Sequence, residues 1–437
     1  MKTLALLEGR AEPSKLKPAK TIGAEEADAV QRVMDEAVNG RVLSGFLGRA
    51  GDGFLGGPIV KSFERQFQDY FKVKHAVSFN SATTALQAAV TALGIGPGDE
   101  VITSPFTMTA TPSAALLNNA IPVFADIHPD TYCIDPESVR KLVTSRTKAI
   151  ITVNIFGGTS DMNALRKIAD EFNLKIIEDN AQAPGGTYDG KFSGTIGDIG
   201  VFSFNVHKVM QCGEGGVFVT NDDKYALRAQ LVRNHGEVIV DDFHDQGAME
   251  DEFLVGNNFR LSEIHAAIAI EQMKKMPAIN KQRQELAGYL TEKLSAFSWI
   301  VPCCVPPNVT HVYYLYPFRF LTDKIGISRA TFAKAMQAEG FPLGVGYVKP
   351  IYLYPLYQQK RMFPRSQFPF VSSEYPSDVS YSKGICPVVE RMFEQELLVT
   401  AVYQPQNGRA VVDEFVDAIS RIQDQVEELK AYEKREA

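Results

Sequence analysis

The feature that most constrains the fold is a regular alternation of strand-like and helix-like segments between residues 75 and 178. Short runs rich in β-branched and aromatic residues lie at 75–79, 100–104, 121–126, 148–156 and 174–178. Stretches with helical spacing of apolar residues lie between several of these runs, at 82–93, 109–118 and 161–172. Strands that alternate with helices form a mainly parallel sheet covered on both faces. Because such sheets bind ligands beyond the carboxyl ends of their strands, we expect the functional residues there.

The remainder of the chain predicts a second, smaller domain. Residues 260–295 have helical periodicity, and we expect Pro277 to bend or divide that helix. The later predicted elements are a strand at 311–320 and helices at 328–339 and about 410–430. We therefore predict an α/β fold, in which a mixed, mainly parallel sheet flanked by helices is joined to a smaller α+β domain. The predicted domains are residues 1–275, which include an N-terminal arm, and residues 276–437. The glycine-rich residues 41–58 predict a long functional loop.

Composition narrows the function. The chain has 437 residues, 45% of them hydrophobic, which is more than one typical domain needs. Its 45 Lys and Arg residues against 52 Asp and Glu residues give a net charge of −7, which argues against a nucleic-acid partner. The five cysteines are irregularly spaced and form no CxxC pair, so neither a disulfide framework nor a metal site is indicated. No apolar run approaches the length of a membrane span, and we expect a cytoplasmic protein.

A carboxylate and an amide follow the predicted strand 174–178. Asp179 stands at the carboxyl end of this strand, and Gln182 follows one turn later. A buried carboxylate at this edge needs a cationic or hydrogen-bonding partner, and the protonated nitrogen of a pyridine ring is one such partner. The alternative for Asp179 is an ordinary helix cap, which needs no ligand.

A lysine next to glycines forms the second candidate. Ser203 and Lys208 precede the glycine-rich residues 213–216, where the backbone can turn tightly and approach a ligand. A lysine shielded from water there has a lowered pKa and becomes a nucleophilic amine. The alternative is a solvated surface lysine, the usual state of this residue type.

Small residues open a predicted helix after the strand 75–79. Ser81, Ala82 and Thr83 place backbone N–H groups and hydroxyls at the start of that helix, which is an arrangement that binds phosphate. The alternative is a Ser/Thr cap with no ligand.

Taken together, these segments resemble the DegT/StrS family of pyridoxal-phosphate (PLP)-dependent sugar aminotransferases, within the aspartate-aminotransferase fold of type I. The resemblance runs from about residue 22 to the C-terminus and is densest between 59 and 275. The motifs that carry it, in the order of the family, are SATTAL, ALGIGPGDEVI, EDNAQA, GDIGVFSFNVHK with GEGG, RNHG and GNNFRLSEIHAA.

The resemblance implies a role for each matching residue. Lys208 matches the lysine that binds PLP as a Schiff base, and Asp179 matches the partner of the pyridine nitrogen. Gln182 matches the residue beside the ring hydroxyl. The positions that match the phosphate site are Ser203, Ala82 and Thr83. Asn258 matches an asparagine that reaches the cofactor of the neighbouring subunit, which implies a homodimer with shared active sites.

Three positions depart from the pattern of the family, and the mildest departure is Ala82, where the family usually has glycine. Met108 stands where an aromatic residue usually stacks on the cofactor ring. Tyr347 is retained from a His-Tyr pair that many sugar-specific members have, but Gly346 replaces the histidine. With these departures the chain resembles members that act on keto-cyclitols, or on other keto compounds, more than the best-known nucleotide-sugar enzymes.

The function implied by the resemblance is ping-pong transfer of an amino group from L-glutamate or L-glutamine to a keto sugar, nucleotide-linked or free. A keto-cyclitol is the alternative acceptor. A PLP-dependent dehydratase is a second alternative, since dehydratases of this family have a histidine at the lysine position and His207 precedes Lys208. A non-catalytic ligand-binding regulator is a third alternative, which the joint presence of Lys208, Asp179 and Ser203 opposes.

Overall fold

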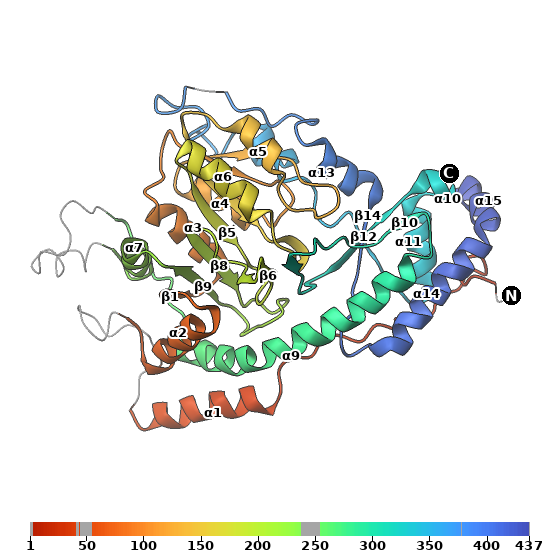
Figure 1. The fold of residues 1–437 in the computed structure, drawn as a ribbon, viewed down its shortest axis with the longest axis horizontal. Helices are drawn as coiled ribbons and strands as arrows, with labels where there is room; N and C mark the ends of the chain where they lie inside the picture. The colour runs from red at the N-terminus through yellow and green to blue at the C-terminus, as the bar shows by residue number, and fades with distance from the viewer. Residues whose placement is uncertain (1–2, 41–42, 44–54, 237–253, 377, 437) are drawn as a thin grey trace, which may run out of the picture.

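The computed structural model describes residues 3–40, 43, 55–236, 254–376 and 378–436 (Figure 1). The long loop predicted at 41–58 therefore lies largely outside the described residues. No helix in the described ranges is long and apolar enough to cross a lipid bilayer. Nor do the side chains described there include a group of three or more His, Cys, Asp and Glu residues that could hold a metal ion.

A seven-stranded sheet forms the centre of the larger part of the molecule. Its strands, in order across the sheet, are β1 (His75–Phe79), β9 (Gly216–Thr220), β8 (Ile199–Ser203), β5 (Lys175–Asp179), β4 (Thr147–Val153), β2 (Glu100–Thr103) and β3 (Ile121–Phe124). Strand β9 runs antiparallel to both of its neighbours, and the other neighbouring pairs are parallel. The predicted α/β fold with a mixed, mainly parallel sheet is confirmed.

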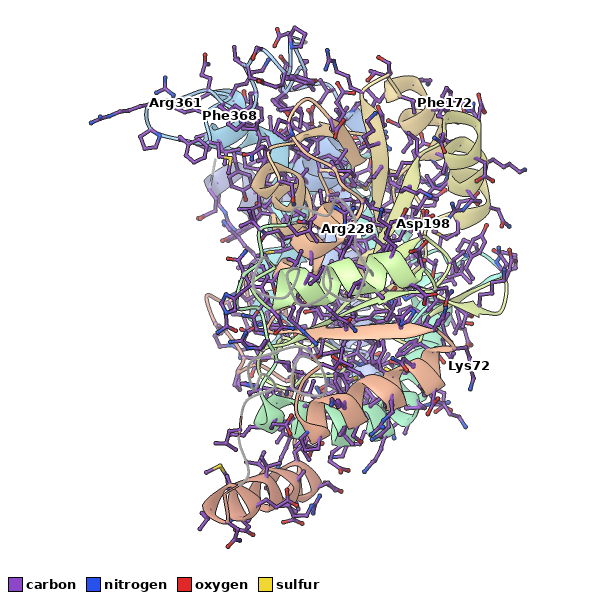
Figure 2. All side chains as sticks on the ribbon, turned by 90° about the vertical axis from the view of Figure 1, so that its left-hand side faces the viewer. Lys72, Phe172, Asp198, Arg228, Arg361 and Phe368 are labelled. Carbon is purple, nitrogen blue, oxygen red and sulfur yellow. The ribbon has the colours of Figure 1, made fainter. Side chains whose placement is uncertain are left out.

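Both faces of this sheet are buried. Successive residues of its central strands point to opposite sides, and helices cover each side. Ile151 and Ile177 lie on the first face and pack against apolar side chains of three helices. Ile150 and Ile176 lie on the second face. The helices on the first face are α3 (Ala82–Ala92), α4 (Ala110–Leu117) and α7 (Asp223–Arg233). Those on the second face are α5 (Pro136–Leu142) and α6 (Met162–Phe172), with α2 (Pro58–Phe71) near β1. Figure 2 shows the edge strand β1 between α7 and α2.

The smaller sheet lies at the far end of the long helix α9 (Glu263–Leu294) (Figure 1). Its strands, in order, are β10 (Ile300–Val301), β12 (Tyr316–Phe320), β14 (Leu397–Thr400) and β13 (Gly344–Val345), and all neighbours are antiparallel. The helices that share its core are α11 (Arg329–Ala338), α14 (Gly408–Asp424) and α15 (Val426–Glu436). The single final helix predicted at about 410–430 is therefore two helices.

Helix α9 continues through Pro277, so this proline does not divide the helix, and a bend at Pro277 stays a prediction. The domain boundary predicted after residue 275 falls inside α9, and the division of the chain at that point stays a prediction. The strand predicted at 311–320 begins only at Tyr316, because Tyr313 has a φ of +51° and the chain turns there. Strands β8 and β9 were not predicted.

An N-terminal arm, residues 3–23, ties the two parts of the molecule together. The N–H of Ala5 donates to the Glu339 carboxylate (2.7 Å), and the N–H of Lys17 donates to Asn407 Oδ1 (2.9 Å). Farther along, the buried Gln272 of α9 donates from Nε2 to the carbonyl of Thr21 (2.9 Å). Helix α1 (Ala24–Val38) then packs along α9 (Figure 1).

A buried carboxylate on β5 holds the loop that leads to β8. Glu178 is fully buried, and its Oε1 accepts hydrogen bonds from the N–H groups of Ile196 and Gly197, both at 2.7 Å. Its Oε2 accepts one from the N–H of Gly194 (2.7 Å) and one from Asn154 Nδ2 (3.2 Å). Each oxygen therefore faces two donors.

We expect Glu178→Gln to lower the free energy of unfolding by about 2–4 kcal/mol, because the new amide NH2 group must face two N–H donors whichever way it turns. Chemical denaturation at fixed protein and cofactor concentrations measures this. Glu171→Gln is the control, since the exposed pair of Glu171 with Arg140 should contribute less than about 1 kcal/mol. Equal effects of the two substitutions would contradict this account of Glu178.

Candidate active site

Asp179 ends strand β5 at the carboxyl edge of the sheet and is buried. Its Oδ2 accepts a hydrogen bond from Thr111 Oγ1 (2.7 Å), and its Oδ1 accepts one from the N–H of Ala181 (3.2 Å). Burial raises the pKa of this carboxyl group, while the two hydrogen bonds and the charge of Lys208 oppose the rise. Both oxygens are therefore fixed in position, in a place where a positively charged partner is favoured.

Lys208 lies in the loop between β8 and β9. The loop is closed by hydrogen bonds from the N–H of Val206 to the carbonyl of Gly213 (3.1 Å) and from the N–H of Lys208 to the carbonyl of Asn205 (2.9 Å). Gly213 has a φ of +87°, which favours glycine at this turn. Burial lowers the pKa of the Lys208 amine, and the charge of Asp179 opposes this. The amine thus has a larger neutral, nucleophilic fraction than a solvated lysine has.

The start of helix α3 supplies hydrogen-bond donors. The Ser81 side chain caps the helix by accepting from the N–H of Thr84 (3.2 Å), while the N–H groups of Ala82 and Thr83 belong to the first turn and have no acceptor within the helix. Ser203, the last residue of β8, is 7% exposed. Gly216 allows the close approach of β9, because a Cβ there would lie 2.5 Å from the Ala82 nitrogen. The arrangement suits an anion.

Gln182 and Tyr347 meet although 165 positions separate them in the sequence. Gln182 Nε2 donates to the Tyr347 hydroxyl (2.8 Å), while Gln182 Oε1 accepts from the N–H of Phe156 (2.7 Å). The amide is thereby fixed in both position and orientation. Met108, by contrast, is 63% exposed.

These side chains line one cavity of about 290 Å³. The predicted site residues that line it are Ala82, Thr83, Met108, Asp179, Gln182, Ser203, Lys208 and Tyr347. Asn258 does not line it; the residue is exposed, and its backbone pairs with Asn234. PLP fits this set of groups, since the first turn of α3 with Ser203 suits a phosphate, the buried Asp179 suits a protonated ring nitrogen, and the Lys208 amine suits an aldehyde.

Sequence reasoning missed two residues at this site. Thr111 bonds to Asp179, and Tyr314 lines the cavity with its ring centroid 4.7 Å from Lys208 Nζ. Thr111 lies three positions after Met108, near the start of the predicted helix 109–118. Its closeness in the sequence to the end of the predicted strand 100–104 was the signal that could have placed it at the site. Tyr314 was hidden in the predicted strand 311–320.

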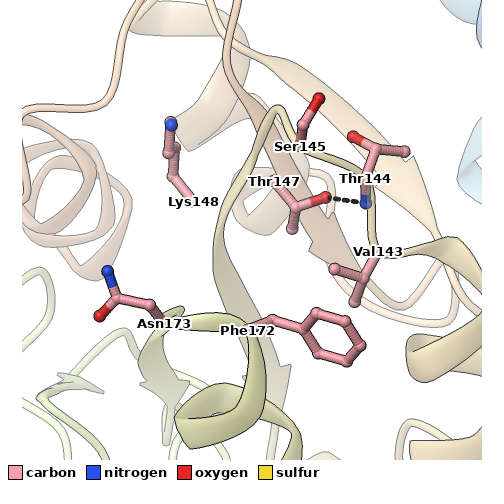
Figure 3. Close-up of a pocket in the computed structure, with 7 residues that line it drawn as sticks. All are labelled: Val143, Thr144, Ser145, Thr147, Lys148, Phe172 and Asn173. Carbon is pink, nitrogen blue, oxygen red and sulfur yellow. Dashed lines mark hydrogen bonds between the residues drawn. The ribbon is translucent and has the colours of Figure 1, made fainter.

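A second cavity, of about 440 Å³, lies at the opposite edge of the sheet (Figure 3). It is lined by Thr147 at the start of β4 and by Phe172 and Asn173 after α6. In the turn before β4, the N–H of Thr144 donates to Thr147 Oγ1 (3.0 Å). Parallel sheets bind their substrates at the carboxyl ends of the strands, and the cavity around Lys208 has that position.

Comparison with known proteins identifies the family. The model of the DegT/DnrJ/EryC1/StrS aminotransferase family matches residues 49–382. The chain is 36% identical over 288 residues to GDP-perosamine synthase of Caulobacter vibrioides, which covers 65% of this chain and 75% of that protein. It is 33% identical over 338 residues to L-glutamine:2-deoxy-scyllo-inosose aminotransferase of Streptoalloteichus tenebrarius, covering 76% of this chain and 78% of that protein.

The solved structure of DesV from S. venezuelae is similar, with a TM-score of 0.74, 31% identity and coverage of 92% of this chain and 94% of that chain. These findings confirm the resemblance drawn from the six motifs, and they agree with the fit of PLP to the cavity. The chain therefore belongs to the DegT/DnrJ/EryC1/StrS family and is a PLP-dependent aminotransferase.

Proposed function

We propose that the protein transfers an amino group from L-glutamate or L-glutamine to the keto group of a sugar, in two half-reactions at the cavity around Lys208. The observation that carries the proposal is the presence, in one cavity, of an amine with a lowered pKa, a buried carboxylate and a helix N-terminus with free donors. An amino donor and a keto acceptor follow from the family, and the identities of both are part of our proposal.

Each residue of the cavity has a distinct task in this proposal. When bound, PLP accepts the electron pair released at the α-carbon of the donor. The Lys208 amine removes a proton from that carbon and later delivers it again, acting first as a base and then as an acid. The Asp179 carboxylate keeps the ring nitrogen protonated. The N–H groups of Ala82 and Thr83, together with the Ser203 hydroxyl, bind the phosphate.

The remaining residues would orient the cofactor. Gln182, held by Phe156 and Tyr347, would bind near the ring hydroxyl, and the polarizable thioether of Met108 would contact the ring. Tyr347 also faces the substrate.

The Cys residues support a reducing, cytoplasmic location, since all five are free thiols.

We favour amino transfer over dehydration because of the position of the adjacent histidine. Both residues line the cavity, but His207 is exposed whereas Lys208 is partly buried. Burial lowers the pKa of the Lys208 amine, as a proton-transferring amine needs. The presence of Asp179 and Ser203 beside it likewise favours a catalyst over a ligand-binding regulator.

A keto-cyclitol is the second candidate acceptor, and two observations favour it. Lys208 is the one Lys or Arg among the described residues lining the cavity, so these residues offer no further cation for a nucleotide diphosphate. Gly346 has a φ of +74°, and a Cβ there would lie 2.5 Å from the carbonyl oxygen of Phe393. The histidine of the sugar-specific pair therefore cannot stand there without a change of backbone.

A panel of acceptors tests the proposal. L-glutamate or L-glutamine should convert the purified PLP enzyme to its pyridoxamine form, followed by the change in visible absorbance. Keto sugars, free and nucleotide-linked, and keto-cyclitols are then offered to this form, and the absorbance of the PLP form should return with one class. If neither donor changes the absorbance, the proposed donor is wrong. If water is lost from the substrate without incorporation of the amino group, the enzyme is a dehydratase.

We also propose a homodimer in which Asn258 of one subunit serves the cavity of the other. In this chain Asn258 is exposed and outside the cavity, which agrees with a role toward a second copy. A mixed dimer of Lys208→Ala and Asn258→Ala subunits should regain activity, because one of its two sites has both residues intact. Random exchange of equal amounts should restore roughly a quarter of the wild-type sites. Activity that stays at the average of the two homodimers would contradict shared sites.

A further inference from the structure

We propose that Tyr314 is a further catalytic residue, whose ring face holds the Lys208 ammonium in the cavity while Lys208 carries the proton. The proposal rests on the proposed role of Lys208. Tyr314 lines the same cavity, and Lys208 Nζ lies over its ring at 4.7 Å from the centroid. The face of an aromatic ring is the negative pole of its quadrupole, so it attracts the ammonium form of an amine.

The position of Tyr314 is fixed by the backbone around it. The N–H of Val312 donates to the carbonyl of Gly157 (2.9 Å), and the N–H of Leu315 donates to the carbonyl of Phe156 (3.3 Å). The buried Tyr403 donates from its hydroxyl to the carbonyl of Tyr314 itself (2.7 Å). The ring is therefore brought to Lys208 by a segment that is hydrogen-bonded on both sides of Tyr314.

Gly157 makes this approach possible. It has a φ of +102°, and a Cβ at this position would lie 2.7 Å from the nitrogen of Tyr313 and 2.8 Å from the nitrogen of Tyr314. Any side chain at residue 157 must push the segment away from the cavity. The glycine is thus needed for contact between the segment that precedes β12 and the loop that follows β4.

The charge of the Lys208 amine changes during the reaction, and the ring face stabilises the charged form. The neutral amine takes a proton from the α-carbon of the donor and becomes an ammonium, and it becomes neutral again when it gives the proton up. Burial alone penalises the ammonium, which would weaken the base. The charge of Asp179 offsets part of this penalty, and the ring face offsets a further part. Burial also raises the pKa of the Tyr314 phenol, so this group stays uncharged at neutral pH.

Tyr314→Leu and Tyr314→Phe separate the ring face from the hydroxyl group. The measurement uses the enzyme in its pyridoxamine form, in which the Lys208 amine is free. The rate at which an amine-selective reagent labels Lys208 is followed against pH by peptide mass spectrometry. We expect Tyr314→Leu to lower the pKa of this amine by about one unit, with Tyr314→Phe close to wild type. The proton-transfer rate should fall about tenfold in the leucine variant, with the KM of the donor nearly unchanged.

A second variant and a control complete the test. Gly157→Ala keeps the tyrosine but displaces it, and should lower the pKa of Lys208 in the same direction even if Tyr314→Leu folds poorly. Tyr289→Leu removes a ring that also faces a lysine, Lys293 at 5.2 Å, away from the cavity, and should leave the labelling of Lys208 unchanged.

The outcomes distinguish this proposal from the proposed function. If Tyr314→Leu and Gly157→Ala both titrate like wild type, the role of Tyr314 is wrong while Lys208 remains the base. If wild-type protein never attaches PLP to Lys208, the proposed function itself fails. If Tyr314→Phe shifts as much as Tyr314→Leu, the hydroxyl group and not the ring face acts on the amine, which also overturns the proposal.

Discussion

Lys208→Ala should lower kcat for amino transfer by at least roughly a thousandfold, because the substitution removes both the covalent anchor of the cofactor and the group that moves the proton. The visible absorbance of PLP attached to protein should be lost as well. The substitution removes no described hydrogen bond of the Lys208 side chain, so the fold should remain. Steady-state kinetics with a saturating donor and an absorbance spectrum at equal protein concentration measure the two effects.

His207→Ala is the matched control, since it changes the neighbouring residue of the same loop. The His207 side chain is exposed, and the backbone N–H of His207 donates a hydrogen bond to Asn205 Oδ1 (3.3 Å). We expect the histidine variant to retain most of the activity. A large loss in His207→Ala with a small loss in Lys208→Ala would reverse the roles of the two residues and favour the dehydratase alternative.

Asp179→Asn should lower kcat on the order of a hundredfold to a thousandfold, which is the range seen when one fixed electrostatic group is removed from an active site. An amide has nearly the same shape as the carboxylate but has no negative charge, so it cannot keep a ring nitrogen protonated. The hydroxyl of Thr111 and the N–H of Ala181, which both donate to Asp179, must then share a single good acceptor. The pH dependence of the visible absorbance should shift along with the rate.

Two outcomes would contradict this role. If Asp179→Asn loses stability as Glu178→Gln does while keeping its kcat, then Asp179 is a structural residue that caps the segment after β5. If Thr111→Val, which removes one donor and keeps the carboxylate, is as inactive as Asp179→Asn, then the position of the carboxylate matters more than its charge. We expect Thr111→Val to be the milder variant, by roughly tenfold or more.

Most strands of the larger sheet, and the helices between them, could be predicted because each segment has its own pattern of apolar residues. The strands at 75–79, 100–104 and 174–178 have apolar runs bounded by polar residues, and the structure has strands there within one residue. Strands β8 and β9 were missed since their runs, IGVFS and GVFVT, contain glycine and lie beside the glycines that flank the Lys208 loop. Periodicity cannot separate such a short buried strand from a loop.

The candidate site was predictable for a different reason. Lys208, Asp179 and Ser203 stand in ordered motifs, so the family pattern brought them together. Tyr314 has no such motif, and its position depends on Gly157, which lies 157 positions earlier in the chain. Contacts between distant segments of this kind leave no local pattern. The roles of the site residues and the dimer stay predictions until the variants described above are measured.

The N-terminal arm has a consequence for how the chain is made. Leu4 is fully buried and its N–H donates to Gln425 Oε1 (3.1 Å), so the arm docks on a residue 421 positions later in the chain. During synthesis the arm must therefore remain undocked until Gln425 has been made. The start of the arm and helix α15 then lie at the same end of the molecule (Figure 1). A circularly permuted chain in which residue 437 is joined to residue 1 would place helix α15 and the arm in one continuous segment.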